Sequence, residues 1–151
     1  MFRSTGKVVY DPHRGTMKNR TQWWCVLNVD CEITRYYRWW VTKQYNPFGI
    51  TDWKIQAPAW DAHVSIIRGE RPPQDKMHLW KKYQGKQFEV QYPDVGQFYA
   101  VAPRKEEAPG LFFLVDVESP ELIEIRKEFG FKSDWKLHLT FGRVYVKLLP
   151  N

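Results

Sequence analysis

The sequence predicts an α+β fold, formed by one two-lobed domain over residues 1–151. Three observations support this prediction. Segments with the two-residue alternation of strands are interspersed with segments of helical periodicity. The pattern His-x-Ser/Thr occurs in a predicted strand of each half, which indicates a weak internal duplication. No linker is long or polar enough to separate the halves, and the length suits one compact domain.

The first half is predicted to contain two strands, a helix and a third strand. In chain order these occupy residues 7–10, 21–29, 31–45 and 61–69. The helix is indicated by apolar residues at the i, i+3, i+4, i+7 and i+8 spacing of one helical face. Asp30 precedes it as a candidate cap, and the turn-forming residues 46–49 end it.

The second half is predicted to contain a helix, three strands, a further helix and a final strand. In chain order these occupy residues 76–84, 86–93, 96–103, 111–118, 119–130 and 135–149. We expect the first two of these strands to pair with each other through a turn at 93–96. Asp75 is the candidate cap of the first helix and Gly85 its end. The second helix has the clearest signals, with Ser119 at its cap and Gly130 past its end.

The composition favours an anionic partner. The formal net charge is +6, and 17% of the residues are aromatic, including eight Trp. Nucleotides, RNA and phosphorylated small molecules are partners that a basic protein attracts. The alternative is that scattered Lys and Arg only solvate the surface. We expect most Trp residues to lie in the core and some aromatic residues to line a surface that grips a flat ligand.

The two cysteines predict no metal site and no disulfide framework. Cys25 and Cys31 fit no common zinc spacing, and we expect them to be reduced, on different elements. The first residues lack the apolar stretch of a signal peptide, and no segment approaches the length of a membrane span. A soluble protein of the cytoplasm is therefore expected.

The chemistry is concentrated in the two His-x-hydroxyl pairs. On a strand, residues two apart leave the same face, so His63 lies beside Ser65, and His138 beside Thr140. If the two strands are neighbours, one neutral imidazole can take a proton from an attacking oxygen while the other, protonated, gives one to the leaving oxygen. The hydroxyls can donate to non-bridging phosphate oxygens.

This set of groups predicts acid–base cleavage of a phosphodiester with no metal and no cofactor. The acidic residues of 116–124 form no ligand pattern with the histidines. The alternative for each pair is a core histidine next to an ordinary strand hydroxyl, and it is less attractive for two equivalent pairs. His13 and His78 have no such partner and are expected at the surface.

The segments HVSIIRG and HLTFGRV, with FFLVDVESPELIEIRKEFGF between them, resemble the signature motifs of the 2H phosphoesterases, the LigT-like superfamily. The resemblance covers about residues 23–146. It implies a bilobal fold of two pseudo-symmetric antiparallel sheets, helices outside and a central groove between the motifs. It also implies metal-independent cleavage at ribose 2′ positions, with His63 and His138 as the acid–base pair and Ser65 and Thr140 binding phosphate. The first motif here has Ser where Thr is more usual.

Within this superfamily the size and aromatic richness are similar to those of bacteriophage anti-CBASS enzymes. That resemblance implies cleavage of cyclic oligonucleotide second messengers in the host cytoplasm, as a counter-defence. The alternatives are an enzyme acting on RNA ends with 2′,3′-cyclic phosphates or on 2′-5′ linkages, and a nucleotide- or RNA-binding module without catalysis. Base identity, linkage, ring size and oligomeric state stay open.

Three further residues are candidate substrate contacts. Tyr10 on the first strand is expected to stack on a base, and the alternative is an edge-strand Tyr packed on its lobe. Arg68 and Arg143 each follow a motif hydroxyl by three residues and are candidates for steering phosphate. Their odd spacing turns them to the opposite sheet face unless the strand ends or contains a bulge.

Overall fold

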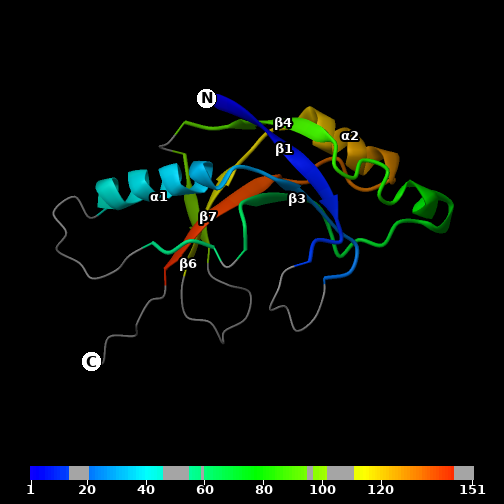
Figure 1. Ribbon diagram of the computed structural model, residues 1–151, viewed down its shortest axis with the longest axis horizontal. Helices are drawn as coiled ribbons and strands as arrows, with labels where there is room; N and C mark the ends of the chain where they lie inside the picture. The colour runs from blue at the N-terminus through cyan, green and yellow to red at the C-terminus, as the bar shows by residue number, and fades with distance from the viewer. Residues whose placement is uncertain (14–20, 46–54, 59, 95–96, 102–110, 145–151) are drawn as a thin grey trace, which may run out of the picture.

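The chain forms an α+β fold (Figure 1). The computed structural model describes residues 1–13, 21–45, 55–58, 60–94, 97–101 and 111–144. The strands within these ranges are β1 (Phe2–Tyr10), β2 (Trp24–Asn28), β3 (His63–Arg68), β4 (Gln87–Tyr92), β5 (Tyr99–Val101), β6 (Leu111–Asp116) and β7 (His138–Val144). The helices are α1 (Cys31–Tyr45), the 3-10 helix η1 (Gln74–Leu79) and α2 (Pro120–Glu128). No helix in this described part of the chain is long and apolar enough to cross a membrane.

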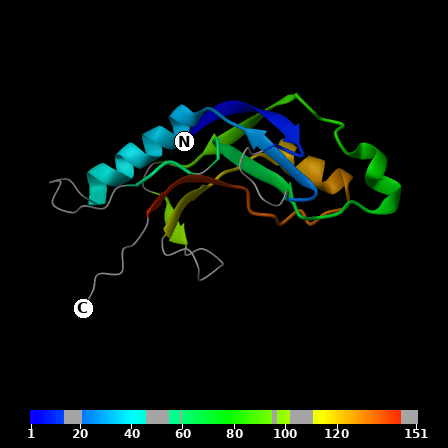
Figure 2. The same cartoon turned by 60° about the horizontal axis from the view of Figure 1, so that its bottom comes forward.

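The strands form one sheet, in the order β4-β1-β2-β3-β7-β6-β5, with antiparallel neighbours. The family resemblance implies two sheets. The structure has one, because the last strand of each half pairs with the other at Val64 and Leu139. The first half keeps β1 and β2 on one side of this junction and the second half keeps β5 and β6 on the other, whereas β4 of the second half pairs with β1 on the first half's side. Figure 2 shows β3 and β7 near the middle of the molecule, with α1 and α2 toward opposite ends.

The predicted pairing of β4 with β5 is wrong. The two strands lie at opposite edges of the sheet, because β4 pairs with β1 and β5 with β6. The first strand begins at Phe2 and not at Lys7, so it is long enough to hold β4 from Phe2↔Tyr92 to Lys7↔Gln87. Of the segments that the sequence predicts, the turn 46–49 and the end of the last strand, 145–149, lie outside the described residues.

The helix predicted at 76–84 is instead the short η1, and Asp75 does not cap it. The residue before η1 is Pro73, which has no side-chain donor or acceptor for a cap. Lys81 and Gly85 have φ of 73° and 78°, and this left-handed backbone cannot continue an α-helix.

The two α-helices follow the predicted signals. The Asp30 carboxylate accepts from the backbone N–H of Glu32 at 2.9 Å, and the Ser119 hydroxyl accepts from that of Leu122 at 3.4 Å. Gly130, past the end of α2, has φ of 79°. The Ser119 hydroxyl also donates to the carbonyl of Glu89 at 2.7 Å, which ties the start of α2 to β4.

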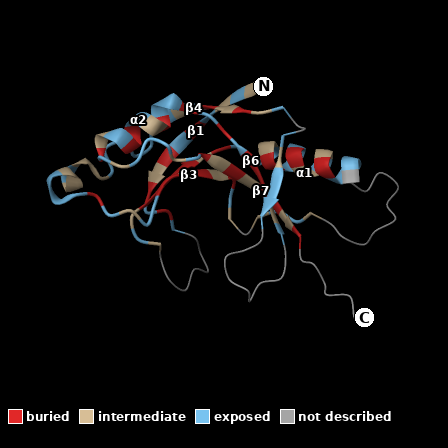
Figure 3. Cartoon of the chain, turned by 180° about the vertical axis from the view of Figure 1, so that it is seen from behind, coloured by how far each residue is buried: buried red, intermediate tan, exposed pale blue. Residues whose placement is uncertain are grey.

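One face of the sheet carries the hydrophobic core. We call it the core face; it includes Val64 and Leu139, both fully buried, and it packs against Tyr37 of α1 and Ile125 of α2. The opposite face, which we call the site face, carries the motif side chains. In Figure 3 the central strands contain buried stretches, while α1 and α2 each have a buried and an exposed side. The core therefore spans both halves of the chain.

Candidate active site

The four motif side chains share the site face at the junction of β3 and β7. Val64 is paired with Leu139, and both point into the core. Continuing this antiparallel register by one residue in each direction puts His63 opposite Thr140 and Ser65 opposite His138. Opposite side chains in such a pair have Cβ atoms about 4.5–5.5 Å apart, and diagonal neighbours about 7–8 Å. By this register the two imidazoles lie on such a diagonal. All four side chains are only partly buried.

Both imidazoles contact a backbone carbonyl in the same way. The Nδ1 atom of His63 lies 2.7 Å from the carbonyl oxygen of Asp61, and that of His138 lies 3.4 Å from the oxygen of Lys136. Because a carbonyl can only accept, Nδ1 carries a proton in each contact, and in the neutral ring Nε2 is the nitrogen that can accept a proton. The backbone two residues before each histidine thus selects the same tautomer in both motifs.

A β-bulge follows the hydroxyl residue in each motif. On β3 the register with β2 shifts so that Ile66 is the extra residue, and Arg68 pairs with Trp24. On β7 the shift against β6 makes Phe141 the extra residue, and Arg143 pairs with Phe112. Each bulge changes the alternation by one residue.

The bulges therefore put both predicted arginines on the site face. Trp24 lies on the same side of β2 as Val26, the partner of Ser65, so Arg68 shares the face of the first motif. Arg143 shares the face of the second motif by the same reasoning from β6. The sequence alone does not determine on which sheet face the two arginines lie, and the bulges do.

Each bulge is held by an arginine from a helix of the other half. Arg126 of α2 donates from Nη1 to the carbonyl of Ile66 at 2.9 Å. Arg38 of α1 donates from Nη1 to the carbonyl of Phe141 at 2.9 Å. In a bulge the extra residue is not paired in the ladder, so these bonds satisfy carbonyls at the two equivalent positions.

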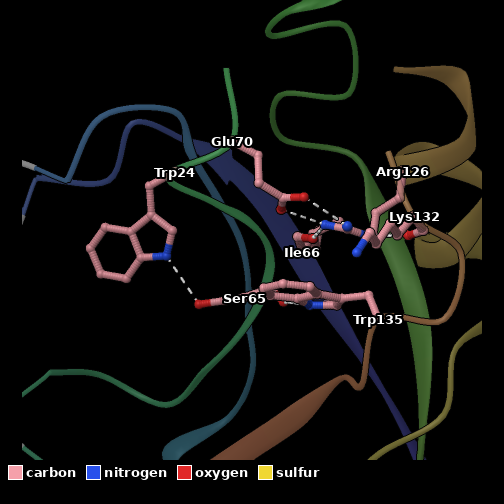
Figure 4. Close-up of polar contacts among 7 residues, drawn as sticks. All are labelled: Trp24, Ser65, Ile66, Glu70, Arg126, Lys132 and Trp135. Atoms are coloured by element: carbon pink, nitrogen blue, oxygen red, sulfur yellow. Dashed lines mark hydrogen bonds and ion pairs between the residues drawn. The ribbon is translucent and has the colours of Figure 1, made fainter. Parts of the chain in front are cut away.

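The first bulge has the stronger support (Figure 4). The guanidinium of Arg126 is fully buried, pairs with both carboxylate oxygens of Glu70 at 2.7 and 2.9 Å, and lies 4.4 Å from the ring centre of Trp135. Trp135 in turn donates to the carbonyl of Ser65 at 3.3 Å. The backbone of the first motif is thereby fixed on the side of α2.

Trp24 is a residue of the site that the sequence analysis does not single out. Its indole N–H donates to the hydroxyl of Ser65 at 3.0 Å, and its ring meets the edge of His63 with centroids 5.6 Å apart. The guanidinium carbon of Arg68 lies 5.3 Å from the centre of the same ring. The only sequence signal is its even spacing from Val26 and Asn28 on a strand. With eight Trp in the chain, that signal does not separate it from the core.

The two sides of the site differ in chemistry. Toward the first half, Asn28 and Lys7 follow His63 across β2 and β1, which gives a polar and basic side. Toward the second half, Leu114 and then Tyr99 follow Thr140 across β6 and β5, which gives an apolar side.

An acidic group lies at the border of the apolar side. Asp116 is opposite His138 and accepts from the hydroxyl of Tyr99 at 2.8 Å. Burial, with a smaller contribution from this bond, raises the pKa of Tyr99 to about 12. The phenol therefore stays protonated and bonded to the carboxylate at neutral pH.

Tyr10 does not belong to this site, and the prediction that it stacks on a base there is wrong. It pairs with Cys25, whose partner on β3 is Ile67, so it lies on the core face. Only 4% of it is exposed, and its ring packs edge-on against Trp80 at 4.9 Å. The alternation of β1 puts Tyr10 and Lys7 on opposite faces, and the core face is the one that includes Tyr10.

Two hollows beside the site, of about 450 and 390 Å³, both include Asp116 in their lining and neither includes a motif histidine. Among the described residues no group of three or more His, Cys, Asp or Glu side chains is arranged to hold a metal ion. His13 and His78 are exposed, as predicted.

No family model, no curated protein and no solved structure matches this chain. The arrangement of the site therefore has to be interpreted from its own geometry. Two imidazoles with equivalent tautomers, two hydroxyls and two arginines on one face are suited to binding a phosphate group and moving protons on both sides of it.

Proposed function

We propose that this protein is a metal-independent phosphodiesterase of the 2H type. The observation that carries the proposal is the register at Val64 and Leu139, which gathers the side chains of both His-x-Ser/Thr motifs on one face. A pair of core histidines would be expected to point into the core, whereas here the core face carries the residues between the motif side chains.

In the proposed reaction the phosphorus atom lies between the two imidazoles. Nε2 of one histidine takes the proton of the attacking oxygen, and Nε2 of the other donates a proton to the leaving oxygen. The P–O bond to the attacking oxygen forms as the bond to the leaving oxygen breaks. Ser65 and Thr140 donate hydrogen bonds to the non-bridging oxygens, and Arg68 and Arg143 offset their negative charge. Which histidine is the acid depends on how the substrate lies.

The arrangement of strands supports a bilobal 2H fold as part of this proposal. Three strands, β1, β2 and β4, lie on the β3 side of the junction, and β4 comes from the second half of the chain. Two on the other side, β6 and β5, complete the half that ends in β7. Each half contributes one motif, one bulge and one bulge-holding arginine at equivalent positions. This correspondence supports the proposal that the two halves are related by a pseudo-twofold axis.

We propose a cyclic oligonucleotide as the substrate, and a role in bacteriophage counter-defence within the host cytoplasm. A cyclic oligonucleotide presents a phosphodiester flanked by two nucleosides, and the site has two different flanks. The apolar side with Tyr99 suits a stacked base, and the basic side with Lys7 suits a second phosphate. The net charge of +6 favours such an anionic ligand.

The direct test is incubation with a panel of 3′,5′-linked cyclic di- and trinucleotides in EDTA, with products analysed by mass spectrometry. We expect cleavage of at least one member. We expect His63→Ala and His138→Ala each to reduce the rate by about two to four powers of ten, and the double variant to lose much less than the product. His78→Ala, at an exposed histidine away from the motifs, is the matched control. If none of the cyclic nucleotides is cleaved, the substrate proposal is wrong.

The pH dependence tests the two roles. We expect a bell-shaped rate profile, because one imidazole has to be neutral while the other is charged. A rate that stays flat between about pH 5 and 8, where imidazoles change their charge, would contradict the assignment.

RNA-end processing is the alternative within the same chemistry. The same six side chains serve a 2′,3′-cyclic phosphate or a 2′-5′ linkage, so relative turnover of these substrates and cyclic oligonucleotides decides between them. A nucleotide- or RNA-binding module is the alternative without catalysis. In that case both histidine variants would retain most of the affinity, and no member of either panel would be cleaved.

A further inference from the structure

Trp24 contacts all three functional side chains of the first motif. Its indole N–H reaches the Ser65 hydroxyl, its ring meets His63, and Arg68 lies over its face. Trp24 is only 2% exposed, yet it is not part of the main core cluster, which lies on the other face of the sheet. Its burial therefore belongs to the site and not to the core.

The contact with Trp24 restricts the direction in which the Ser65 hydroxyl can donate its proton. An indole N–H can only donate, so the Ser65 oxygen is the acceptor and its own proton has to point along another direction. We propose that Trp24 is a positioning residue that commits the Ser65 hydroxyl to donating its proton to an anionic oxygen of the ligand. That this oxygen belongs to a phosphoryl group rests on the proposed function.

The backbone at Ser65 is already held by other contacts. The remaining freedom is rotation of the Ser65 hydroxyl, which the hydrogen bond from Trp24 restricts. Its backbone carbonyl accepts from Trp135, and the next carbonyl, of Ile66, accepts from Arg126. A serine hydroxyl otherwise samples its rotamers and can donate to nearby backbone acceptors. Because the Ser65 oxygen accepts from Trp24, the Ser65 O–H is already oriented as a donor before the ligand binds. Such preorganisation strengthens electrostatic stabilisation.

The position equivalent to Trp24 in the second motif has no hydrogen-bond donor. Trp24 is the partner of Arg68 on β2, and the partner of Arg143 on β6 is Phe112, whose side chain has no N–H or O–H. The two hydroxyls are therefore inequivalent, although the bulges after them are held in the same way. We expect the orientation of the Ser65 hydroxyl to depend on Trp24 of β2 and that of the Thr140 hydroxyl to be independent of Phe112 of β6.

A double-mutant cycle tests this inference on the cleaved substrate. Trp24→Phe keeps an aromatic ring and removes the N–H, and we expect a loss of about 3- to 10-fold in kcat/KM, the range of one neutral hydrogen bond. In the Ser65→Ala background the same change should cost less than 2-fold. A wild-type rate for Trp24→Phe, or equal losses in both backgrounds, would overturn the inference while the proposed function stands.

Trp80→Phe is the matched control for the loss of an indole hydrogen bond. Its N–H donates to the carboxylate of Asp11 at 3.0 Å, away from the motif side chains, and we expect its kcat/KM to stay within 2-fold of wild type. This comparison separates the loss of the Ser65 contact from a general effect of removing a partly buried indole.

A second readout does not require turnover or a folded Trp24 variant. Inorganic phosphate is titrated into the ¹⁵N-labelled wild type and Ser65→Ala, and the indole N–H signal of Trp24 is followed after assignment through its contacts with the His63 ring. We expect phosphate to shift this signal in the wild type and not in Ser65→Ala. If no phosphodiester is cleaved, this shift still supports the inference; an unchanged signal in the wild type overturns it.

Discussion

At the scale of single residues, the apolar side of the site depends on Tyr99. Tyr99 is 39% exposed, and its hydroxyl donates to Asp116, which is the partner of His138. Stacking of a base on an aromatic side chain contributes about 1–3 kcal/mol. Tyr99 therefore offers an exposed and anchored ring on the site face, whereas Tyr10 is buried on the core face and cannot contact a ligand there.

We therefore expect Tyr99→Ala to raise KM by between about 5-fold and 150-fold, with a smaller effect on kcat. Tyr99→Phe keeps the ring and should stay close to wild type. Steady-state kinetics on the cleaved cyclic oligonucleotide measures both, and Tyr36→Ala, at an exposed tyrosine of α1, is the control. Equal KM values for Tyr99→Ala and Tyr36→Ala would count against a base at this position.

The two cysteines are predicted to differ in reactivity because one is buried and the other is exposed. Cys25 is fully buried on the core face beside Tyr10, and burial raises the pKa of its thiol. A raised pKa keeps the unreactive thiol form as the pH increases. Cys31 is exposed at the start of α1. At pH 8 we expect a thiol reagent to add one label to the native protein and two in denaturant, as measured by intact mass. Two rapid labels in the native protein would contradict the burial of Cys25.

At the scale of elements, the two bulges connect the helices to the site. Arg126 donates to the first bulge from a fully buried position with Glu70 as its partner, whereas Arg38 donates to the second from a partly buried one. Burial also lowers the pKa of Arg38. Losing either arginine removes a donor from the carbonyl next to a motif hydroxyl, so stability and activity are coupled through the bulges.

We expect Arg126→Met to reduce the free energy of unfolding by about 3 kcal/mol, because it leaves the partly buried Glu70 carboxylate and the carbonyls of Ile66 and Lys132 without their donor. Arg38→Met should cost about 1–2 kcal/mol. Chemical denaturation measures both. Arg35→Met, which removes a surface pair with Glu32, should change stability by less than about 0.5 kcal/mol. Equal stabilities for the three variants would mean that the bulges do not depend on these arginines.

At the scale of the whole molecule, the halves are joined by one core. The core cluster includes side chains from both halves, and each helix contacts the motif strand of the other half. We expect a single cooperative unfolding transition, with coincident midpoints for tryptophan fluorescence and far-ultraviolet circular dichroism. Two separated transitions would show that the lobes unfold independently and that the junction at Val64 and Leu139 is weak.

Much of the fold follows from local signals that act over a few residues. The caps of α1 and α2 at Asp30 and Ser119 are confirmed because capping depends on the residue itself and on the next turn of backbone. The predicted helix at 76–84 failed where the backbone enters the left-handed region at Lys81, which residue propensities do not reveal. The pairing of β4 failed because alternation defines the faces of a strand but not its neighbour.

For the site, the sequence by itself determined that His63 shares a face with Ser65 and His138 with Thr140, because side chains on a strand alternate with a period of two. Only the tertiary structure decided that these two faces meet, that bulges turn Arg68 and Arg143 toward them, and that Trp24 and not Tyr10 is their aromatic neighbour. The physical reason is that these facts depend on register between strands far apart in the chain, and register is set by packing of the whole core.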